Sequence, residues 1–557
     1  MTTSLKVKKT NRSEPVRLPS EGFNRGVLIL CVMLTLLGIG FRFYGISADE
    51  FFYYDEGLYL NMNRKLLKFI HQNWEQALRD FPQVLETLGK SALGSPKALF
   101  LLISDARVFW GGYAHWHFPR LVSAVSGLLT IFLTYLFAKR YYANLWIGGL
   151  SMVVLALMPS HVFYSRLAMQ ESLATLFFLL GFYLYIFSER SGLKVFLSAL
   201  SFAAAYFCNY RLLILPLFVL LFEGYGFLLE KRSLAMRKFI WFLLIFLAIV
   251  LGIGALYGGR NLSITWAWIL RQSYLAGEEE KSLLTFLSYP YYIFRLESVF
   301  LGMAVFAHIY FLWRRRWKGA FPYFIVLAFM LIYSFSMEQG VRYLCVVLPF
   351  LAMAGASGVV VMGQESPDRY RQKLVRIMTG LMVISLGFNA YRITRFQTAY
   401  KSSMEFLNHL DPQAKVLSSQ PFIQNLYVED PDRVKEVPKL FPQFVQEYLN
   451  GFQYLILCPQ SYVSKTQSEK RFDPPLINYL EFIVNRVPPL KVYDHLQPWE
   501  LERFVMDHNT HLERSLHFLR PADARRGQLR IYSIAQCIQA VQRQLENKFQ
   551  PERKEWH

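Results

Sequence analysis

The chain has 557 residues, of which 54% are hydrophobic and 17% aromatic, and it carries a formal net charge of +20. This composition is too apolar for a soluble protein. The basic residues gather in alternate loops between apolar runs, which argues against nucleic-acid binding. Membrane topology explains the charge instead, because positively charged loops stay on the cytoplasmic side.

The N-terminal residues 1–25 are polar and basic, and the long apolar run that follows has no small-residue cleavage site. We interpret them as a cytoplasmic tail before a retained membrane span rather than a cleaved signal peptide. Apolar runs of about 17–25 residues can cross a bilayer as helices. We predict about eleven spans, with 144–160 and 172–188 tilted or partly re-entrant: 26–46, 120–138, 144–160, 172–188, 195–209, 212–229, 239–257, 291–312, 320–337, 342–362 and 377–391. An odd number of spans places the C-terminal region outside.

Residues 47–118 form a long first external loop within a membrane domain that spans residues 26–391. The loop contains two helix-like stretches, about 55–71 and 74–90. Apolar residues recur at helical spacing in the first, which is typical of a helix lying in the membrane interface. A second external loop, about 258–290, is long enough to form a mobile cover over a site.

The last 166 residues, 392–557, are polar enough to form a small exported domain. Short buried strands are predicted at 416–418, 454–457, 491–493 and 529–533, and helices at 403–409, 441–450 and 475–487. Strands alternating with helices indicate an α/β layer. Cys458 and Cys537 lie in this region, where a disulfide is allowed, although sequence alone cannot bring the two residues together.

Asp55 is the leading candidate for a catalytic base, because the acidic pair Asp55-Glu56 follows the first span on the external side. At that level a carboxylate can meet a lipid headgroup and a water-soluble acceptor. A sugar leaving as a lipid phosphate needs one base, plus cations to stabilise the departing anion. Asp55 could equally be an acid that starts a helix, and Asp49 and Glu50 remain alternative bases.

Four basic residues are available at the same level for a phosphate: Lys97, Arg166, Arg211 and Arg342. Each could instead extend from an apolar surface to the interface. Glu171, at the external mouth between two spans, is either functional or a helix start paired with Arg166. His115 and His117 form a weak metal motif without a third ligand, and His161 is interpreted as a loop or core residue.

Several segments, taken in order over about residues 40–390, resemble the GT-C superfamily of membrane glycosyltransferases. The resemblance is to the branch of protein O-mannosyltransferases and lipid A aminoarabinose transferases (glycosyltransferase family 39-like). The matching segments are Phe41-Arg42-Phe43-Tyr44-Gly45, Asp55-Glu56-Gly57-Leu58-Tyr59 with Arg64, Ser95-Pro96-Lys97-Ala98-Leu99, Phe118-Pro119-Arg120-Leu121-Val122-Ser123-Ala124, Met158-Pro159-Ser160-His161-Val162-Phe163-Tyr164-Ser165-Arg166 through Glu171, and Arg342-Tyr343-Leu344 with Leu348-Pro349.

The resemblance implies a polytopic α-helical membrane protein of GT-C fold, with an extracytoplasmic α/β C-terminal domain, in a bacterial inner membrane. It implies an inverting glycosyltransferase that moves a sugar from a polyprenyl-phosphate donor to an extracytoplasmic hydroxyl. Asp55 would be the base, and Glu56 would position the acceptor or orient Asp55. Lys97 and Arg211 become candidate phosphate contacts. Further substrate contacts are expected at Tyr59, Arg166, Glu171 and Arg342.

The sequence departs from the family pattern at two points. These departures weaken the assignment of the phosphate-binding residues more than the assignment of Asp55 as the base. Pro-Lys-Ala stands where Lys-Pro-Pro is usual, and Glu171 stands where Asp is common. No cofactor is expected, and a divalent metal, the sugar and the acceptor stay open. Two other functions remain: a transporter or flippase for a lipid-linked sugar, and a non-catalytic assembly partner that keeps the fold.

Overall fold

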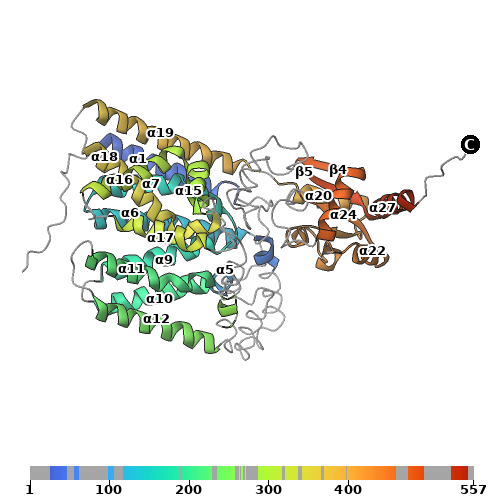
Figure 1. The fold of residues 1–557 in the computed structure, drawn as a ribbon, viewed down its shortest axis with the longest axis horizontal. Coiled ribbons are helices and arrows are strands. Elements are labelled where there is room, and N and C mark those ends of the chain that lie inside the picture. Colours follow the sequence, from blue (N-terminus) through green and yellow to red (C-terminus); the bar gives the residue numbers. More distant parts are fainter. Residues whose placement is uncertain are drawn as a thin grey trace, which may run out of the picture.

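The computed structural model consists of a bundle of long helices with a smaller α/β domain at one end (Figure 1). The residues that it describes are 25–46, 56–61, 98–105, 117–188, 191–228, 235–256, 263, 265–267, 270, 286–315, 320–335, 341–364, 369–396, 398–438, 440–458, 474–494 and 528–549.

The bundle contains a helix at each of the eleven predicted spans: α1 (Arg25–Phe43), α6 (His117–Tyr142), α7 (Leu145–Leu157), α9 (Glu171–Ile186), α10 (Gly192–Cys208), α11 (Leu215–Leu228), α12 (Met236–Leu256), α16 (Val299–Arg315), α17 (Phe321–Ser334), α18 (Leu348–Gln364) and α19 (Arg369–Thr394). Within the described residues, six helices are long and apolar enough to cross a membrane, or seven if the bent pair formed by α7 and α8 (Pro159–Arg166) counts as one span. The chain is therefore an integral membrane protein, as predicted.

Short helices and helical turns lie at the ends of several spans. The predicted span 144–160, expected together with 172–188 to be tilted or partly re-entrant, ends in a bend of 57° between α7 and α8. Pro159 stands at the first position of α8, where a missing backbone N–H is tolerated but continuation of the preceding helix is not. The remaining turns at the bundle are α5 (Ala98–Asp105), η2 (Tyr210–Ile214), α15 (Ser288–Tyr292), the π-helical turn η3 (Ile293–Glu297) and η4 (Val341–Val347).

A fully buried arginine joins the end of α1 to the end of α7. Arg42 Nη1 donates to the carbonyl of Ala156 at 2.6 Å, and Nη2 donates to that of Leu155 at 3.1 Å. These carbonyls at the end of a helix would otherwise have no intrahelical partner. Arg42 also contacts Nδ1 of His161, a buried residue that the sequence indicated to be either a loop or a core histidine. Gly45, with φ of +67°, turns the chain after α1.

The α/β domain is built on a five-stranded sheet with the strand order β2-β1-β3-β5-β4. Strand β1 pairs in parallel with β2 and with β3, whereas β5 pairs antiparallel with β3 and β4. The elements are α20 (Tyr400–Leu410), β1 (Lys415–Ser418), α21 (Pro421–Gln424), η5 (Asn425–Tyr427), η6 (Pro431–Arg433), β2 (Val434–Glu436), α22 (Phe441–Leu449), β3 (Phe452–Leu457), α24 (Pro474–Arg486), β4 (Lys491–Asp494), β5 (Gln528–Ser533) and α27 (Ile534–Phe549).

Alternation along the strands divides the domain into two cores. Val416, Ile456 and Ile531 face α20 and α21, while their neighbours Leu417 and Leu455 face the layer of α22, α24 and α27. The four predicted strands and three predicted helices are confirmed. Strand β2, helix α21 and the 16-residue helix α27 were missed. The first two are only three or four residues long and carry little periodic signal.

The two cysteines of the domain do not form a disulfide. Cys458 lies in the core beside α20, and Cys537 lies in the core on the other face of the sheet. Both are free thiols, and burial raises the pKa of each to about 12. The disulfide that the sequence allowed but could not establish is therefore not formed, because the sheet separates the two side chains.

Candidate active site

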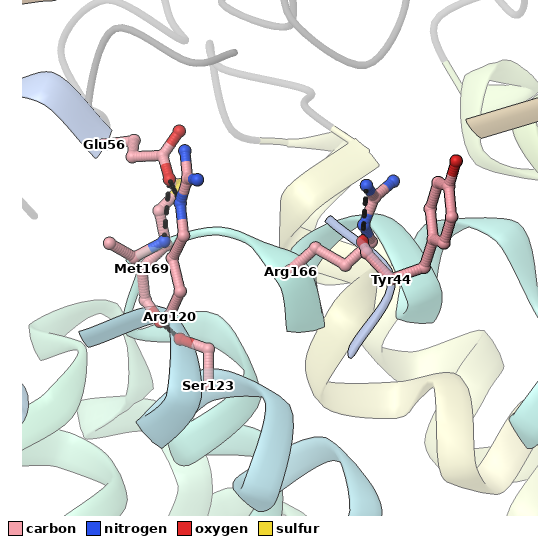
Figure 2. A network of polar contacts seen from close by, with 7 residues as sticks. Tyr44, Glu56, Arg120, Ser123, Arg166 and Met169 are labelled. Atoms are coloured by element: carbon pink, nitrogen blue, oxygen red, sulfur yellow. Dashed lines mark hydrogen bonds and ion pairs between the residues drawn. The ribbon is translucent and has the colours of Figure 1, made fainter. Parts of the chain in front are cut away.

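A short helix, residues 56–61, brings Glu56 to the end of the bundle that faces the α/β domain (Figure 1). The Glu56 carboxylate is fully buried, and its Oε1 accepts hydrogen bonds from Arg120 Nε at 2.8 Å and from the backbone N–H of Ala168 at 3.1 Å. Arg120, on the first turn of α6, is only 2% exposed. Figure 2 shows the Arg120 side chain extending toward Glu56 above it. Since two ordered groups hold Glu56, the start of this helix is tied to α6.

The second anchor of this helix is the segment of residues 167–170, which connects α8 to α9. Tyr59 is buried, and its hydroxyl donates to Gln170 Oε1 at 3.0 Å, while its ring contacts Phe100 of α5 edge-on. Ser123 of α6 donates to the carbonyl of Met169 at 2.9 Å (Figure 2). The connector is thus bonded both to the Glu56 helix and to α6. Tyr59, predicted as a substrate contact, packs inside this junction.

Arg166 and Glu171, whose pairing was one of the two alternatives for Glu171, border the same connector at its two ends. Arg166, half-buried at the end of α8, donates to the carbonyls of Ile393 at 3.0 Å and Tyr44 at 3.1 Å. Figure 2 shows it directed toward Tyr44, apart from the Glu56–Arg120 pair. Glu171 is the first residue of α9 and 3% exposed, where a negative charge is favoured by the helix dipole. In these contacts Arg166 joins the ends of α1, α8 and α19.

Arg211 and Arg342, which are 131 positions apart in the sequence, meet over one aromatic ring. The guanidinium carbon of Arg211 lies 4.5 Å from the centroid of the Tyr343 ring, and that of Arg342 lies 5.2 Å from it. Arg342 Nη2 also donates to the Tyr343 hydroxyl at 3.3 Å. Turn η4, which carries Arg342, packs against α8 and α9. Two guanidinium groups at one ring make a concentrated positive charge suited to a phosphate.

Asp55, the predicted base, and Lys97 lie outside the described residues, as do the alternative bases Asp49 and Glu50 and the first histidine of the motif, His115. The predicted helical stretch 74–90 also lies outside them, as does most of 55–71 and of the loop 258–290. Asp55 is the residue that precedes Glu56 in the chain, so its backbone is joined directly to the anchored helix. Within the described part, no three His, Cys, Asp or Glu side chains are grouped to hold a metal.

Arg120 and Gln170 are the residues that the sequence prediction of the site missed. Both stand within the segments quoted for the resemblance, yet only their structural positions show their roles. A signal for Arg120 was present, since a charged residue at the start of an apolar run is costly to bury without a partner. Its partner, Glu56, is 64 positions away, and sequence spacing alone does not pair them.

Comparison with known proteins supports the fold. No protein-family model matches the sequence, and no curated protein does. Among solved structures, ArnT from Cupriavidus metallidurans bound to undecaprenyl phosphate is similar, with a TM-score of 0.54, 13% identity, and coverage of 91% of this chain and 98% of that chain. The Archaeoglobus fulgidus oligosaccharyltransferase in its apo form has a TM-score of 0.51 and 8% identity, covering 78% of this chain and 70% of that chain.

The same archaeal enzyme, AglB, in complex with an inhibitory peptide and a dolichol-phosphate has a TM-score of 0.50 and 9% identity, covering 78% of this chain and 69% of that chain. Both proteins are glycosyltransferases of the GT-C fold. The chain therefore has the GT-C fold, as the sequence motifs indicated. At these identities the comparison establishes the fold alone, since one fold can host many activities.

Proposed function

We propose that the chain is an inverting glycosyltransferase that moves a sugar from a polyprenyl-phosphate donor to an extracytoplasmic hydroxyl. The observation that carries the proposal is the anchored carboxylate of Glu56. Glu56 is held by Arg120 and Ala168 at the end of a GT-C bundle, and Asp55 is its neighbour in the chain. The similar ArnT structure contains undecaprenyl phosphate, and the similar AglB structure contains dolichol-phosphate and a peptide.

The proposed reaction is a single displacement. The acceptor oxygen attacks the anomeric carbon from the face opposite the phosphate, and its proton passes to the Asp55 carboxylate. The bond between the anomeric carbon and the phosphate oxygen breaks, and the electron pair leaves with the polyprenyl phosphate. Because the attack and the departure occur on opposite faces, the anomeric configuration is inverted.

The described cations have separable roles in this proposal. Arg211 and Arg342, together at Tyr343, stabilise the leaving phosphate, with Lys97 as a further candidate. Arg120 is occupied by Glu56, so it maintains the position of the acidic pair. Glu56, being fully buried, orients Asp55 rather than contacting the acceptor. The proposal places the N-terminus in the cytoplasm and the α/β domain outside, as the distribution of positive charge predicts.

The proposal is tested by mixing purified protein with a panel of polyprenyl-phosphate sugars and membrane acceptors, then measuring free polyprenyl phosphate and labelled acceptor. Asp55→Asn is expected to lower turnover by about 10²–10⁴-fold, the usual contribution of a general base. Arg211→Met and Arg342→Met are each expected to lower it by about 10²–10³-fold. Arg237→Met, at the exposed and predicted cytoplasmic start of α12, is the matched control.

Two outcomes would contradict the proposal. Failure of well-folded wild-type protein to release polyprenyl phosphate from every donor would favour the assembly-partner or transporter alternatives. Equal release by wild type and Asp55→Asn would remove Asp55 as the base, leaving Asp49 and Glu50 to be tested in the same assay.

A further inference from the structure

The α/β domain contacts the Glu56 helix through a corner formed by residues 418–424, where β1 ends and α21 begins. Asn61, at the end of the Glu56 helix, donates its side-chain amide both to the carbonyl of Gly57 at 2.8 Å and to that of Phe422 in α21. Leu60 is 2% exposed and packs in the same core as Ile423. The blue helix between α5 and the α/β domain in Figure 1 is this segment. The domain core therefore includes a residue of the membrane domain.

Gly57 is the point of closest approach. A Cβ atom at this position would lie 2.8 Å from the backbone nitrogen of Ile423 and 2.9 Å from its Cα. Contacts below 3.0 Å with backbone atoms cannot be relieved by rotating a side chain, so any larger residue has to push the helix and α21 apart. The glycine allows the two backbones to lie against each other.

The corner itself is firmly attached to the sheet. Ser419 N–H donates to the carbonyl of Ile456 at 3.1 Å, and Ser419 Oγ accepts from the N–H of Cys458 at 2.9 Å. Ser418 Oγ accepts from the N–H of Gln420 at 2.8 Å and also bonds to Gln424. These contacts join the turn after β1 to the end of β3. The position of the sheet therefore fixes the position of α21, and with it the surface that the Glu56 helix contacts.

The corner lies at the carboxyl end of β1, the strand beside which the strand order of the sheet reverses. In the order β2-β1-β3, the chain leaves β1 toward β2 and returns on the other side at β3, so the strand order reverses beside β1. Open α/β sheets commonly bind their ligands at the carboxyl ends of the strands where the order reverses. In this protein, the turn that leaves the carboxyl end of β1 leads into α21, which contacts the Glu56 helix.

We infer that the α/β domain positions the active site, and that Gly57 and Asn61 are positioning residues because they form the contact between the Glu56 helix and α21. This inference rests on the proposed function. The Glu56 helix is held on one side by Arg120 and Gln170 and on the other by α21. Displacing α21 moves the helix, and with it the backbone joined to Asp55. A purely structural contact would change stability alone, whereas a positioning contact changes turnover at constant donor affinity.

The test compares Gly57→Ala and Asn61→Leu with wild type, using Gly40→Ala as the matched control. Gly40 lies in α1, and a Cβ there would meet nothing within 4 Å. Both test variants are expected to lower kcat by about 10²-fold with the donor KM little changed, since misplacing a reacting group by about 1 Å has that effect. The control should retain wild-type kcat and KM.

Hydrogen exchange of the backbone amides of residues 56–61 gives a second readout that requires no turnover. Gly57→Ala is expected to raise their exchange rate by about tenfold or more, because local opening becomes easier, while exchange in α6 stays unchanged. If wild-type protein cleaves no donor, the proposed function fails. The exchange data then still show whether the contact with α21 holds the Glu56 helix in place. Wild-type kcat in an active Gly57→Ala protein, or wild-type exchange in that variant, would overturn the inference.

Discussion

The buried pair of Glu56 and Arg120 should be strongly coupled. Their atoms are 2.8 Å apart, and their side chains are 0% and 2% exposed respectively. Arg120→Met leaves a buried carboxylate without its cation, and Glu56→Gln leaves a buried guanidinium without its anion. Each single change is expected to destabilise the protein by about 3–5 kcal/mol.

The double variant Glu56→Gln/Arg120→Met is expected to be less destabilised than either single variant. Both charges are then absent, and the introduced amide oxygen can still accept from the Ala168 N–H, which Glu56 now accepts at 3.1 Å. A residual loss of about 1–2 kcal/mol is expected from the altered hydrogen bonds. The sum of the single effects should therefore exceed the double effect by several kcal/mol, well above ordinary non-additivity.

The assay is reversible unfolding in mixed micelles by SDS titration, followed by far-UV circular dichroism for wild type and the three variants. Two single effects below about 1 kcal/mol that add in the double variant would refute the reasoning, because that behaviour is typical of solvent-exposed ion pairs. Such a result would mean that the Glu56 helix leaves the bundle surface in solution.

Two further predictions concern groups away from the reaction. Arg42→Lys is expected to cost about 2–3 kcal/mol in the same titration, because a single ammonium cannot replace the guanidinium that bonds the carbonyls of Leu155 and Ala156. The exposed control Arg237→Lys should change stability by less than about 0.5 kcal/mol, and equal effects would contradict the capping role. Cys458 and Cys537 should resist alkylation at pH 8 until the protein is unfolded, since burial raises the pKa of both thiols to about 12. Unfolded thiols ionise near pH 8.5, so the contribution of each thiol to the stability of the α/β domain should be constant below that pH and fall above it by about 1.4 kcal/mol per pH unit. Rapid labelling of the native protein at pH 8 would contradict the burial of the two thiols.

Much of the fold follows from the sequence because its signals are local. A membrane-spanning helix satisfies its own backbone hydrogen bonds, so apolar length alone predicts spans such as 120–138, observed within α6. Short, mostly apolar runs likewise predict β3 and β5 as buried strands, and the two faces of each strand pack in different cores. The order of the quoted motifs indicated the GT-C fold, which the solved structures of ArnT and AglB share.

Only the tertiary structure decided which of the candidate residues meet. Arg211 and Arg342 share the Tyr343 ring, Glu56 pairs with Arg120, and Asn61 bonds to Phe422 across 361 positions. No periodicity encodes such contacts, because they depend on how helices and the sheet pack after each has formed. The sequence by itself determined that a membrane-spanning bundle of GT-C fold would be followed by a small α/β domain. Packing decided that Glu56 is buried against Arg120 and that the α/β domain lies against the Glu56 helix, at a point where Gly57 has no Cβ to keep the two backbones apart.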